Sequence, residues 1–319
     1  MQEVFTSVVS QDNMYAWQEA HKTGIGASQI AAVLGEHRFG SRLRIWAEKV
    51  GRLEPRDFSD NEAVQMGIEL EPFVAKKYEK RTGRAISGAG YLLRSTEHPW
   101  ALCTPDYWLC GEDGDWNIPL QIKTTSAWRL NDWEEGPPKE VWWQVQHEML
   151  VTGAPWASIG VLVGGQRFMW TDVSRDEQAM ERIVREGYAF WQDVQQQTYP
   201  LLDGNSADAL TELFPTSAEG EQVALPQEAV EWDIQLQNLK AQRRLLDDDI
   251  QAYEDRFKLA IGEAESGILH DGSGAYTHKS QQRWSYKLPE GSSKPSSGDL
   301  VTTIAHISEF RVLRRSGGR

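Results

Sequence analysis

The chain has 319 residues, of which 40% are hydrophobic and 25% are charged, proportions that are ordinary for a globular protein. Its formal charge of −14 weighs against a protein that coats nucleic acid, because phosphate contacts need lysine and arginine. No apolar run is long enough to span a bilayer, and the two cysteines provide no disulfide framework. We therefore expect no membrane partner and a reducing, cytoplasmic location.

The first sixty residues contain one segment with a functional pattern. Residues 1–12 are predicted to be unstructured, and a helix is predicted over 13–22. The sequence GIGAS, Gly24 to Ser28, then places glycines before another helix. The free backbone N–H groups of a helix start, with the hydroxyl of Ser28, favour a phosphate site. A tight turn with a helix cap is the alternative interpretation.

A longer helix is predicted over 61–82, after a shorter one over 41–50. Its acidic residues Glu69 and Glu71 are only two positions apart. Neighbouring acids on a surface helix usually face solvent, so the pattern alone assigns neither of them a role.

The segment CTPDYWLCGEDGDWNIPLQIKTTS, residues 103–126, predicts a β-hairpin with its turn at 112–115. Its first strand carries Asp106. Its return strand carries Gln121 and Lys123 on one face, with Ile122 on the other face, directed into a core. A carboxylate is a hard ligand for Mg²⁺, and a lysine beside it can act on a water or a phosphate. The hairpin therefore favours metal-assisted phosphodiester hydrolysis.

The next predicted helix, over 139–152, carries further polar residues. Gln144 and Glu148 are four residues apart and share a face. A glutamine on this helix is suited to orient a water molecule, and Gln144 and Gln146 are the two candidates. His147 is either a general base or a structural residue. Two strands and a helix over 176–197 are predicted to complete this part of the chain.

The composition predicts three regions, over 1–198, 199–228 and 229–319. The middle region is rich in proline, glycine, serine and acidic residues, and is predicted to be a linker with one short helix. Apolar residues then recur at steps of three, four or seven, which predicts a long amphipathic helix that either forms a coiled coil or folds back. Short strands and a basic end follow. The fold class expected for the first region is mixed α/β.

Residues 17–194 resemble the YqaJ-like viral recombinases, relatives of the phage λ exonuclease within the PD-(D/E)xK nuclease superfamily. The resemblance implies a restriction-endonuclease-like core, in which a central mixed sheet is flanked by helices. The matching segments, in chain order, are GIGAS, GIELE (residues 67–71), CTPD (103–106), LQIKTTS (120–126), QVQHEMLVTG (144–153) and the strand VLVGG (161–165).

The resemblance also implies roles for individual residues. Mg²⁺, with Mn²⁺ as a substitute, would be held by Glu71, Asp106, the side chain of Gln121 and the backbone carbonyl of Ile122. Two groups would act on the attacking water, namely Lys123 and Gln144. The groups that would hold a DNA phosphate are Ser28 and either His21 or Lys22, at a place where arginine is more usual.

The activity implied by the resemblance is 5′ to 3′ resection of linear double-stranded DNA by a phage or prophage exonuclease. Such enzymes act at DNA ends and pass the exposed 3′ strand to a single-strand annealing protein. By the same analogy we expect a homo-oligomeric ring of subunits.

Gln121 departs from this pattern, because the resemblance predicts glutamate there. Either the amide oxygen ligates metal in a natural variant, or the glutamine is an engineered, inactivating change. Two alternative functions follow. One is a nuclease-fold protein that binds DNA ends or recruits a partner without cutting, and the other is a PD-(D/E)xK endonuclease.

Overall fold

The computed structural model describes residues 4–10, 13–111, 114–287 and 304–316. The chain divides into two compact units, Met1–Glu219 and Gly220–Arg319. Glu112 and Asp113 of the predicted hairpin turn lie outside the described residues. No helix in the described part of the chain is long and apolar enough to cross a membrane.

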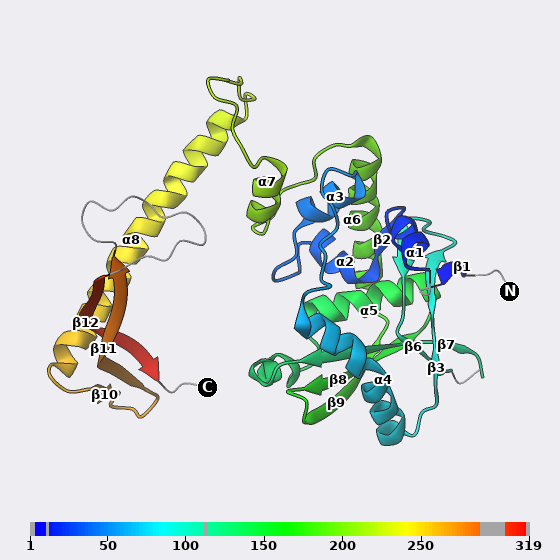
Figure 1. Cartoon of the computed structure of the whole chain (residues 1–319), viewed down its shortest axis with the longest axis horizontal. Helices are drawn as coiled ribbons and strands as arrows, with labels where there is room; N and C mark the ends of the chain where they lie inside the picture. The colour runs from blue at the N-terminus through cyan, green and yellow to red at the C-terminus, as the bar shows by residue number, and fades with distance from the viewer. Residues whose placement is uncertain (1–3, 11–12, 112–113, 288–303, 317–319) are drawn as a thin grey trace. The chain divides into compact units, whose positions relative to one another are not determined.

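A five-stranded mixed sheet forms the base of the first unit (Figure 1). Strand β7 lies at its centre, antiparallel to β6 and parallel to β8. The predicted hairpin is the β6–β7 pair, and it brings the segments that carry Asp106 and Lys123 side by side. The strands, in sheet order, are β3 (Ile86–Gly88), β6 (Tyr107–Cys110), β7 (Trp116–Thr125), β8 (Trp156–Val163) and β9 (Arg167–Ser174).

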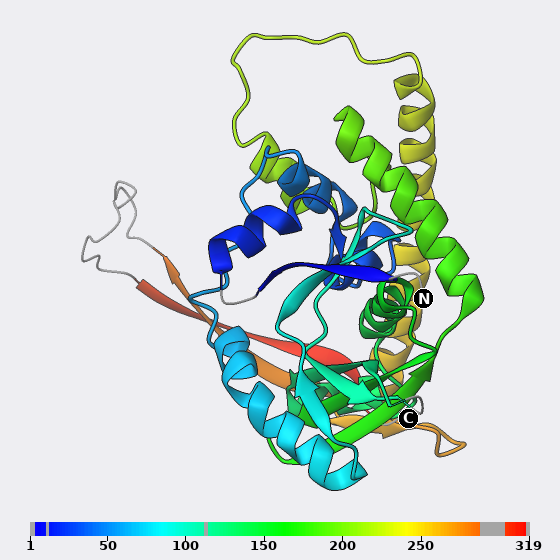
Figure 2. The same cartoon turned by 90° about the vertical axis from the view of Figure 1, so that its right-hand side faces the viewer.

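Two helices cover opposite faces of this sheet, and both pack against β7 (Figure 1 and Figure 2). Helix α4 (Glu62–Thr82) lies on the face that carries Ile122, whose side chain meets Gly160 of β8 together with the ring of Tyr78. Helix α5 (Lys139–Thr152) lies on the face that carries Gln121 and Lys123. The alternation along β7 thus places Ile122 in the core and its polar neighbours beneath α5.

Local sequence signals set the bounds of both helices. The Asn61 side chain accepts hydrogen bonds from the first backbone N–H groups of α4, and α5 begins directly after Pro138. Each helix ends at a glycine with a left-handed backbone, Gly83 and Gly153, both with φ 73°, a conformation that glycine adopts without strain.

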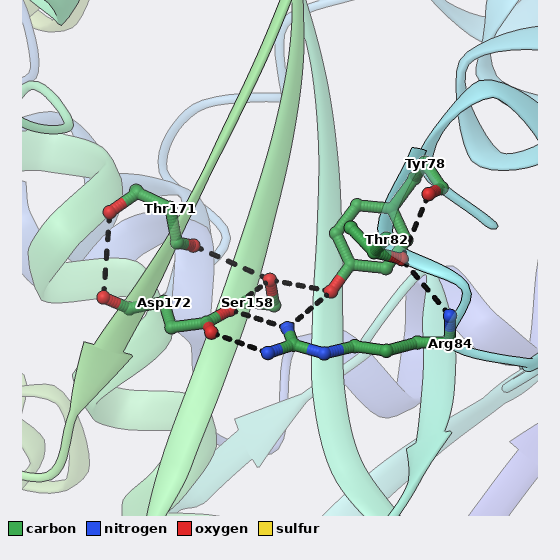
Figure 3. Close-up of polar contacts among 6 residues, drawn as sticks. All are labelled: Tyr78, Thr82, Arg84, Ser158, Thr171 and Asp172. Carbon is green, nitrogen blue, oxygen red and sulfur yellow. Dashed lines mark hydrogen bonds and ion pairs between the residues drawn. The ribbon is translucent and has the colours of Figure 1, made fainter. Parts of the chain in front are cut away.

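A polar network fixes the C-terminal end of α4 to the sheet (Figure 3). The Tyr78 hydroxyl donates to Ser158 Oγ at 2.8 Å, and Ser158 donates to Asp172 at 2.8 Å. Arg84, just past the helix, donates twice to Asp172 at 2.7 Å and once to the Tyr78 hydroxyl. Because Tyr78 and Ser158 are buried, these bonds fix the register of α4 against β8 and β9.

A four-stranded sheet lies on the other side of α5, together with helix α2. Its strands, in order, are β1 (Phe5–Ser10), β4 (Tyr91–Ser95), β5 (Ala101–Cys103) and β2 (Ile25–Gly26). The prediction that residues 1–12 are unstructured is wrong for β1. That strand pairs antiparallel with β4, and Phe5 stacks against Trp108 with ring centroids 6.2 Å apart.

The GIGAS segment forms β2 and the start of α2 (Ala27–Val33). Strand β2 runs parallel to β5, and a Cβ added at Gly24 would lie 2.5 Å from the Trp100 carbonyl oxygen. Glycine is therefore required at position 24 for this close approach of two backbones. The remaining helices of this unit are α1 (Met14–His21), α3 (Arg42–Lys49), the 3₁₀ helix η1 (Ala127–Trp133), α6 (Glu177–Gln196) and α7 (Ala207–Leu213).

Residues 199–213 pack onto the first unit, which extends beyond the predicted boundary at residue 198. Tyr199 packs against Trp46, with ring centroids 4.6 Å apart. Asp203 accepts a hydrogen bond from the Arg42 backbone at 2.9 Å, and it caps α3 in this way. These two contacts attach the segment to α3.

The second unit contains one long helix and a small sheet. Helix α8 (Ala229–Ile261) has 33 residues, of which Ile261 is the one buried residue. The strands β10 (Ser266–Ile268), β11 (Ala275–Lys287) and β12 (Ile304–Ser316) form an antiparallel sheet. Phe257 of α8 stacks on Tyr276 of β11 with ring centroids 3.9 Å apart. That stacking joins the helix to the sheet within this unit.

Candidate active site

Strand β7 presents Gln121 and Lys123 together. Lys123 Nζ donates to Gln121 Oε1 at 3.0 Å, and Gln121 Nε2 donates to the Thr104 carbonyl at 3.4 Å. Gln121 is 1% exposed. The amide is therefore held at both ends, with its oxygen turned toward the ammonium of Lys123.

Asp106 lies between β5 and β6 and is tied to β7 through the backbone. Its Oδ2 accepts a hydrogen bond from the Ile122 N–H at 2.7 Å. Burial raises the pKa of Asp106, and the charge of Lys123 and the Ile122 N–H oppose that rise. One carboxylate oxygen is thus fixed by β7, which leaves the other available to a ligand.

Helix α4 contributes Glu71, which is half-buried. Burial, followed by the negative charge of Asp106, raises the pKa of Glu71 to about 7, while Lys123 and a hydrogen bond with Tyr107 act in the opposite direction. Glu69 is exposed. Of Glu69 and Glu71, Glu71 is therefore the one that interacts with the charges of the site.

Helix α5 contributes Gln144 and Glu148. Gln144 Nε2 donates to Glu148 Oε1 at 3.0 Å. Glu148 is fully buried, and burial, with the charge of Asp106, raises its pKa to about 8. The sequence showed that these two residues share a helix face, but gave Glu148 no role. The signal that would have found it is the four-residue spacing from Gln144 combined with the absence of a carboxylate at position 121.

The two alternatives on α5 have structural positions instead. Gln146 accepts a hydrogen bond from the Asp176 N–H at 3.0 Å and donates to the Ser174 carbonyl at 2.9 Å, so it joins α5 to the start of α6. His147 is fully buried, edge-on to Trp100. Burial lowers the pKa of His147 to about 3, which leaves it a neutral core residue.

A pocket of about 210 Å³ lies beside this cluster, and its lining includes Asp106 and Gln144 but not Glu71, Gln121, Lys123 or Glu148. Its lining brings the phosphate-site candidates His21 and Ser28 together with the site residues Asp106 and Gln144. The residues that line it are Trp17, His21, Ala27, Ser28, Thr104, Asp106 and Gln144. Lys22 is not among them, because its ammonium is exposed and pairs with Glu19 at 2.7 Å.

His21 reaches the pocket as a neutral ring. It stacks on Trp17 with ring centroids 4.1 Å apart, and burial, with the charge of Lys49, lowers its pKa to about 4. A Cβ at Gly26 would lie 2.7 Å from His21 Cε1, so glycine at position 26 makes room for the ring. His21 can donate a hydrogen bond to an anion, but it does not bring the positive charge that an arginine would.

The oxygen donors around Asp106 suit a hard divalent cation. Glu71, Asp106 and Glu148 all have raised pKa values, and the charge of Asp106 contributes at the other two. A bound cation would relieve this excess of negative charge. Within the described ranges no three His, Cys, Asp or Glu side chains form a metal-binding group. The carboxylates therefore need neutral oxygens, and the Gln121 amide and the Ile122 carbonyl are suitable ones. Oxygen donors of this kind match Mg²⁺ or Mn²⁺ rather than Zn²⁺.

We expect the metal-free protein to lose stability as the pH rises above neutrality. Glu71 and Glu148 have folded pKa values of about 7 and about 8, against an ordinary value of 4.5. Their stabilising contribution is complete below the unfolded pKa and is lost as the pH rises through the folded pKa. Burial lowers the pKa values of His21 and His147. These two residues therefore reduce the stability of the protein only at a pH below 6.5, the ordinary pKa of histidine.

Denaturant unfolding in EDTA between pH 6.5, the ordinary pKa of histidine, and about pH 8.5 isolates the effect of the two carboxyl groups. The free energy of unfolding should fall across this range, and it should fall less in Glu148→Gln. The exposed Glu69→Gln variant is the control and should follow the wild type. A flat profile for the wild type would contradict the assigned environment of these acids.

Comparison with known proteins places the chain in a family. A family model described as the YqaJ-like viral recombinase domain matches residues 16–155. The uncharacterized protein YqaJ of Bacillus subtilis (strain 168) is 30% identical over 259 residues, which cover 79% of this chain and 80% of that protein.

Solved structures are also similar. An alkaline exonuclease (LHK-Exo) from Laribacter hongkongensis is 24% identical, with a TM-score of 0.49, over 58% of this chain and 94% of that one. A phage related exonuclease from Haemophilus somnus 129PT is 14% identical, with a TM-score of 0.42, over 57% of this chain and 97% of that one. The predicted α/β fold is confirmed by the mixed sheet and its flanking helices. The family model and the identity to YqaJ along four-fifths of that protein show that this chain belongs to the YqaJ-like viral recombinase family.

Proposed function

We propose that this chain is a Mg²⁺-dependent DNA exonuclease that removes nucleotides from the 5′ ends of linear double-stranded DNA. One observation carries the proposal. In a member of a viral recombinase family, Asp106 and Gln144 line the same pocket as His21 and Ser28, and Lys123 acts on the charge of Asp106 from the neighbouring strand. The pocket thus combines oxygen donors for a metal with hydrogen-bond donors for a phosphate.

In this proposal Mg²⁺ is held by Asp106, Glu71, the Gln121 amide oxygen and the Ile122 carbonyl, and Mn²⁺ can substitute. When bound, the ion lowers the pKa of a water and stabilises charge on the scissile phosphate. Lys123 donates to Gln121 Oε1 at 3.0 Å, and its ammonium group is placed to position that water. Gln144, on the pocket wall, orients the same water.

The phosphate at the DNA end is assigned to the opposite wall of the pocket. Ser28 is exposed and offers its hydroxyl, and the neutral His21 ring offers an N–H. Both are neutral donors, so the metal and Lys123 supply the positive charge near the DNA. Lys22 is assigned no contact, because it points away into its pair with Glu19.

The family resemblance also suggests a partner protein and an oligomeric state. A recombinase exonuclease leaves a 3′ single strand, whose partner would be a single-strand annealing protein. A ring of subunits would keep the enzyme on its DNA. These expectations concern the assembly, and the pocket chemistry does not depend on them.

Digestion of defined DNA substrates tests the proposed activity. With Mg²⁺, the protein should degrade a linear duplex with 5′ phosphates, should degrade the unphosphorylated duplex more slowly, and should leave supercoiled circles intact. EDTA should abolish degradation. A 5′ end label should be released early and a 3′ end label late. Release of the 3′ label first would overturn the polarity, and cleavage of circles would indicate the endonuclease alternative.

Gln121 favours a second candidate function, a protein of this family that binds DNA ends and recruits a partner without cutting. The amide removes a charge from the position where the family resemblance predicts glutamate. This function predicts no cleavage by the wild type, tight binding of duplex ends, and cleavage that appears only in Gln121→Glu. Degradation by the wild type within about 10²-fold of that variant would exclude it, since single catalytic groups contribute on that scale.

A further inference from the structure

With glutamine at position 121, the site has one negative charge fewer than the family resemblance predicts. Its amide is 1% exposed and is held between Lys123 and the Thr104 carbonyl. It therefore occupies a fixed position beside Asp106, but as a neutral group. Proteins that bind divalent cations tightly use several carboxylates. The ligand set proposed above supplies negative charge through Asp106 and Glu71 alone, so a carboxylate that makes up for the missing charge of Gln121 would strengthen cation binding.

Glu148 has the free oxygen that such a site requires. Its side chain is 0% exposed, and Oε1 accepts a hydrogen bond from Gln144 at 3.0 Å. Its Oε2 is buried and has no hydrogen-bond partner in the part of the chain that the structure describes. A buried carboxylate oxygen without a partner costs folding free energy. A cation bound to Oε2 would remove that cost.

The free oxygen belongs to the cluster around Asp106. The charge of Asp106 contributes to the raised pKa of Glu148, and the charge of Lys123 opposes it. Gln144, one helical turn before Glu148, lines the pocket together with Asp106. Helix α5 also packs directly on β7, the strand that carries Gln121. The carboxylate of Glu148 therefore faces the same small region as the amide of Gln121, from the helix instead of the strand.

We propose that Glu148 is a metal ligand of this site, and that it supplies from α5 the carboxylate that Gln121 does not supply from β7. The proposal rests on the function proposed above for the identity of the metal. It explains why a glutamine is compatible with a metal site at position 121. It also gives Gln144 a second task, because its amide fixes Glu148 Oε1 and leaves Oε2 to the ion.

Mn²⁺ binding tests the proposal independently of DNA cleavage. Affinity is measured by calorimetry for the wild type, for Glu148→Gln and for the double variant Gln121→Glu/Glu148→Gln, which moves the carboxylate back to the strand. Loss of outer-shell partners weakens metal binding by about 10–100-fold. Loss of a direct ligand in Glu148→Gln should weaken it by at least about 100-fold. The double variant should recover affinity to within about tenfold of the wild type. Glu69→Gln, an exposed acid on α4, is the control and should bind as the wild type does.

Thermal unfolding in EDTA tests whether Glu148 is a metal ligand or has only a structural role. If Glu148 is a ligand, Glu148→Gln should be at least as stable as the wild type without metal, since the amide replaces a buried carboxyl group whose Oε2 has no hydrogen-bond partner among the described residues. It should also gain much less from added Mn²⁺. A structural role predicts the reverse, with lower stability in EDTA and unchanged affinity.

Three outcomes would overturn the proposal: unchanged Mn²⁺ affinity in Glu148→Gln, no recovery in the double variant, or no binding by the wild type. Failure of the proposed function gives a different result. In that case Mn²⁺ binding still depends on Glu148, but no linear DNA is degraded. Conversely, DNA degradation that persists in Glu148→Gln with unchanged affinity would leave the exonuclease function standing without this ligand.

Discussion

Replacing Asp106 by asparagine should lower the rate of DNA degradation by about 10²–10³-fold or more, the scale found for single preorganised groups in other enzymes. Asp106 is anchored by the Ile122 N–H at 2.7 Å and its charge acts on Glu71 and Glu148. The amide loses the charge that attracts the ion. The asparagine oxygen can take the place of Asp106 Oδ2 and still accept the hydrogen bond from the Ile122 N–H.

Single-turnover release of nucleotides from a 5′-phosphorylated linear duplex measures this effect. The same protein should unfold in EDTA at a temperature no lower than that of the wild type, because a carboxylate with a raised pKa has been neutralised. Asp60→Asn is a matched control, since Asp60 is exposed in the loop before α4. An Asp106→Asn protein that degrades DNA at the wild-type rate would show that the reaction takes place elsewhere.

Replacing Lys123 by methionine should lower the rate by about 10²–10⁴-fold, the usual contribution of a group that transfers or positions a proton. Unlike the Asp106 variant, it should retain Mn²⁺ affinity or bind the ion more tightly. The reason is electrostatic. The ammonium opposes the raised pKa values of Glu71 and Asp106, so its removal makes the site more negative and more attractive to a cation.

The pair of measurements separates the two roles. Calorimetry with Mn²⁺ should distinguish Lys123→Met, which keeps the metal, from Asp106→Asn, which weakens its binding. Lys76→Met, which removes an exposed lysine from the same unit, should leave both the rate and the affinity unchanged. Lys123→Met with weakened Mn²⁺ binding would indicate that the lysine organises the site instead of acting on the water.

Most of the fold could be predicted because its signals are local. The period-two geometry of a strand put Gln121 and Lys123 on one face of β7 and Ile122 on the other, and the helix predicted over 139–152 coincides with α5. Strand β1 could not be predicted in this way. Its partner, β4, lies more than eighty residues further along the chain, and none of its own residues is buried, so no buried apolar pattern marks it.

The part of the site carried by the hairpin was also a local prediction. Asp106, Gln121 and Lys123 lie close together because β6 and β7 are adjacent antiparallel strands. The roles of Glu71 and Gln144 came from the family resemblance and stay predictions. Gln144 lines the pocket together with Asp106, and burial with the charge of Asp106 raises the pKa of Glu71. The neutral state of His21 could not be predicted, because it depends on burial and on Lys49, which is 28 residues away.

The proposed role of Glu148 could not be predicted from helical spacing alone. The four-residue interval placed it on the same face as Gln144, but an acid on a helix is usually solvated. The packing of α5 between two sheets buries that face and leaves Glu148 Oε2 without a hydrogen-bond partner among the described residues. Its role therefore depends on tertiary structure.

A crystal of the wild-type protein grown with Mn²⁺ would test the central claim most directly, through the anomalous signal of the ion. We expect a Mn²⁺ peak beside the pocket that Asp106 and Gln144 line, bonded to carboxylate oxygens of both Asp106 and Glu148. A pocket without Mn²⁺, or an ion bonded to neither of these carboxylates, would contradict the account.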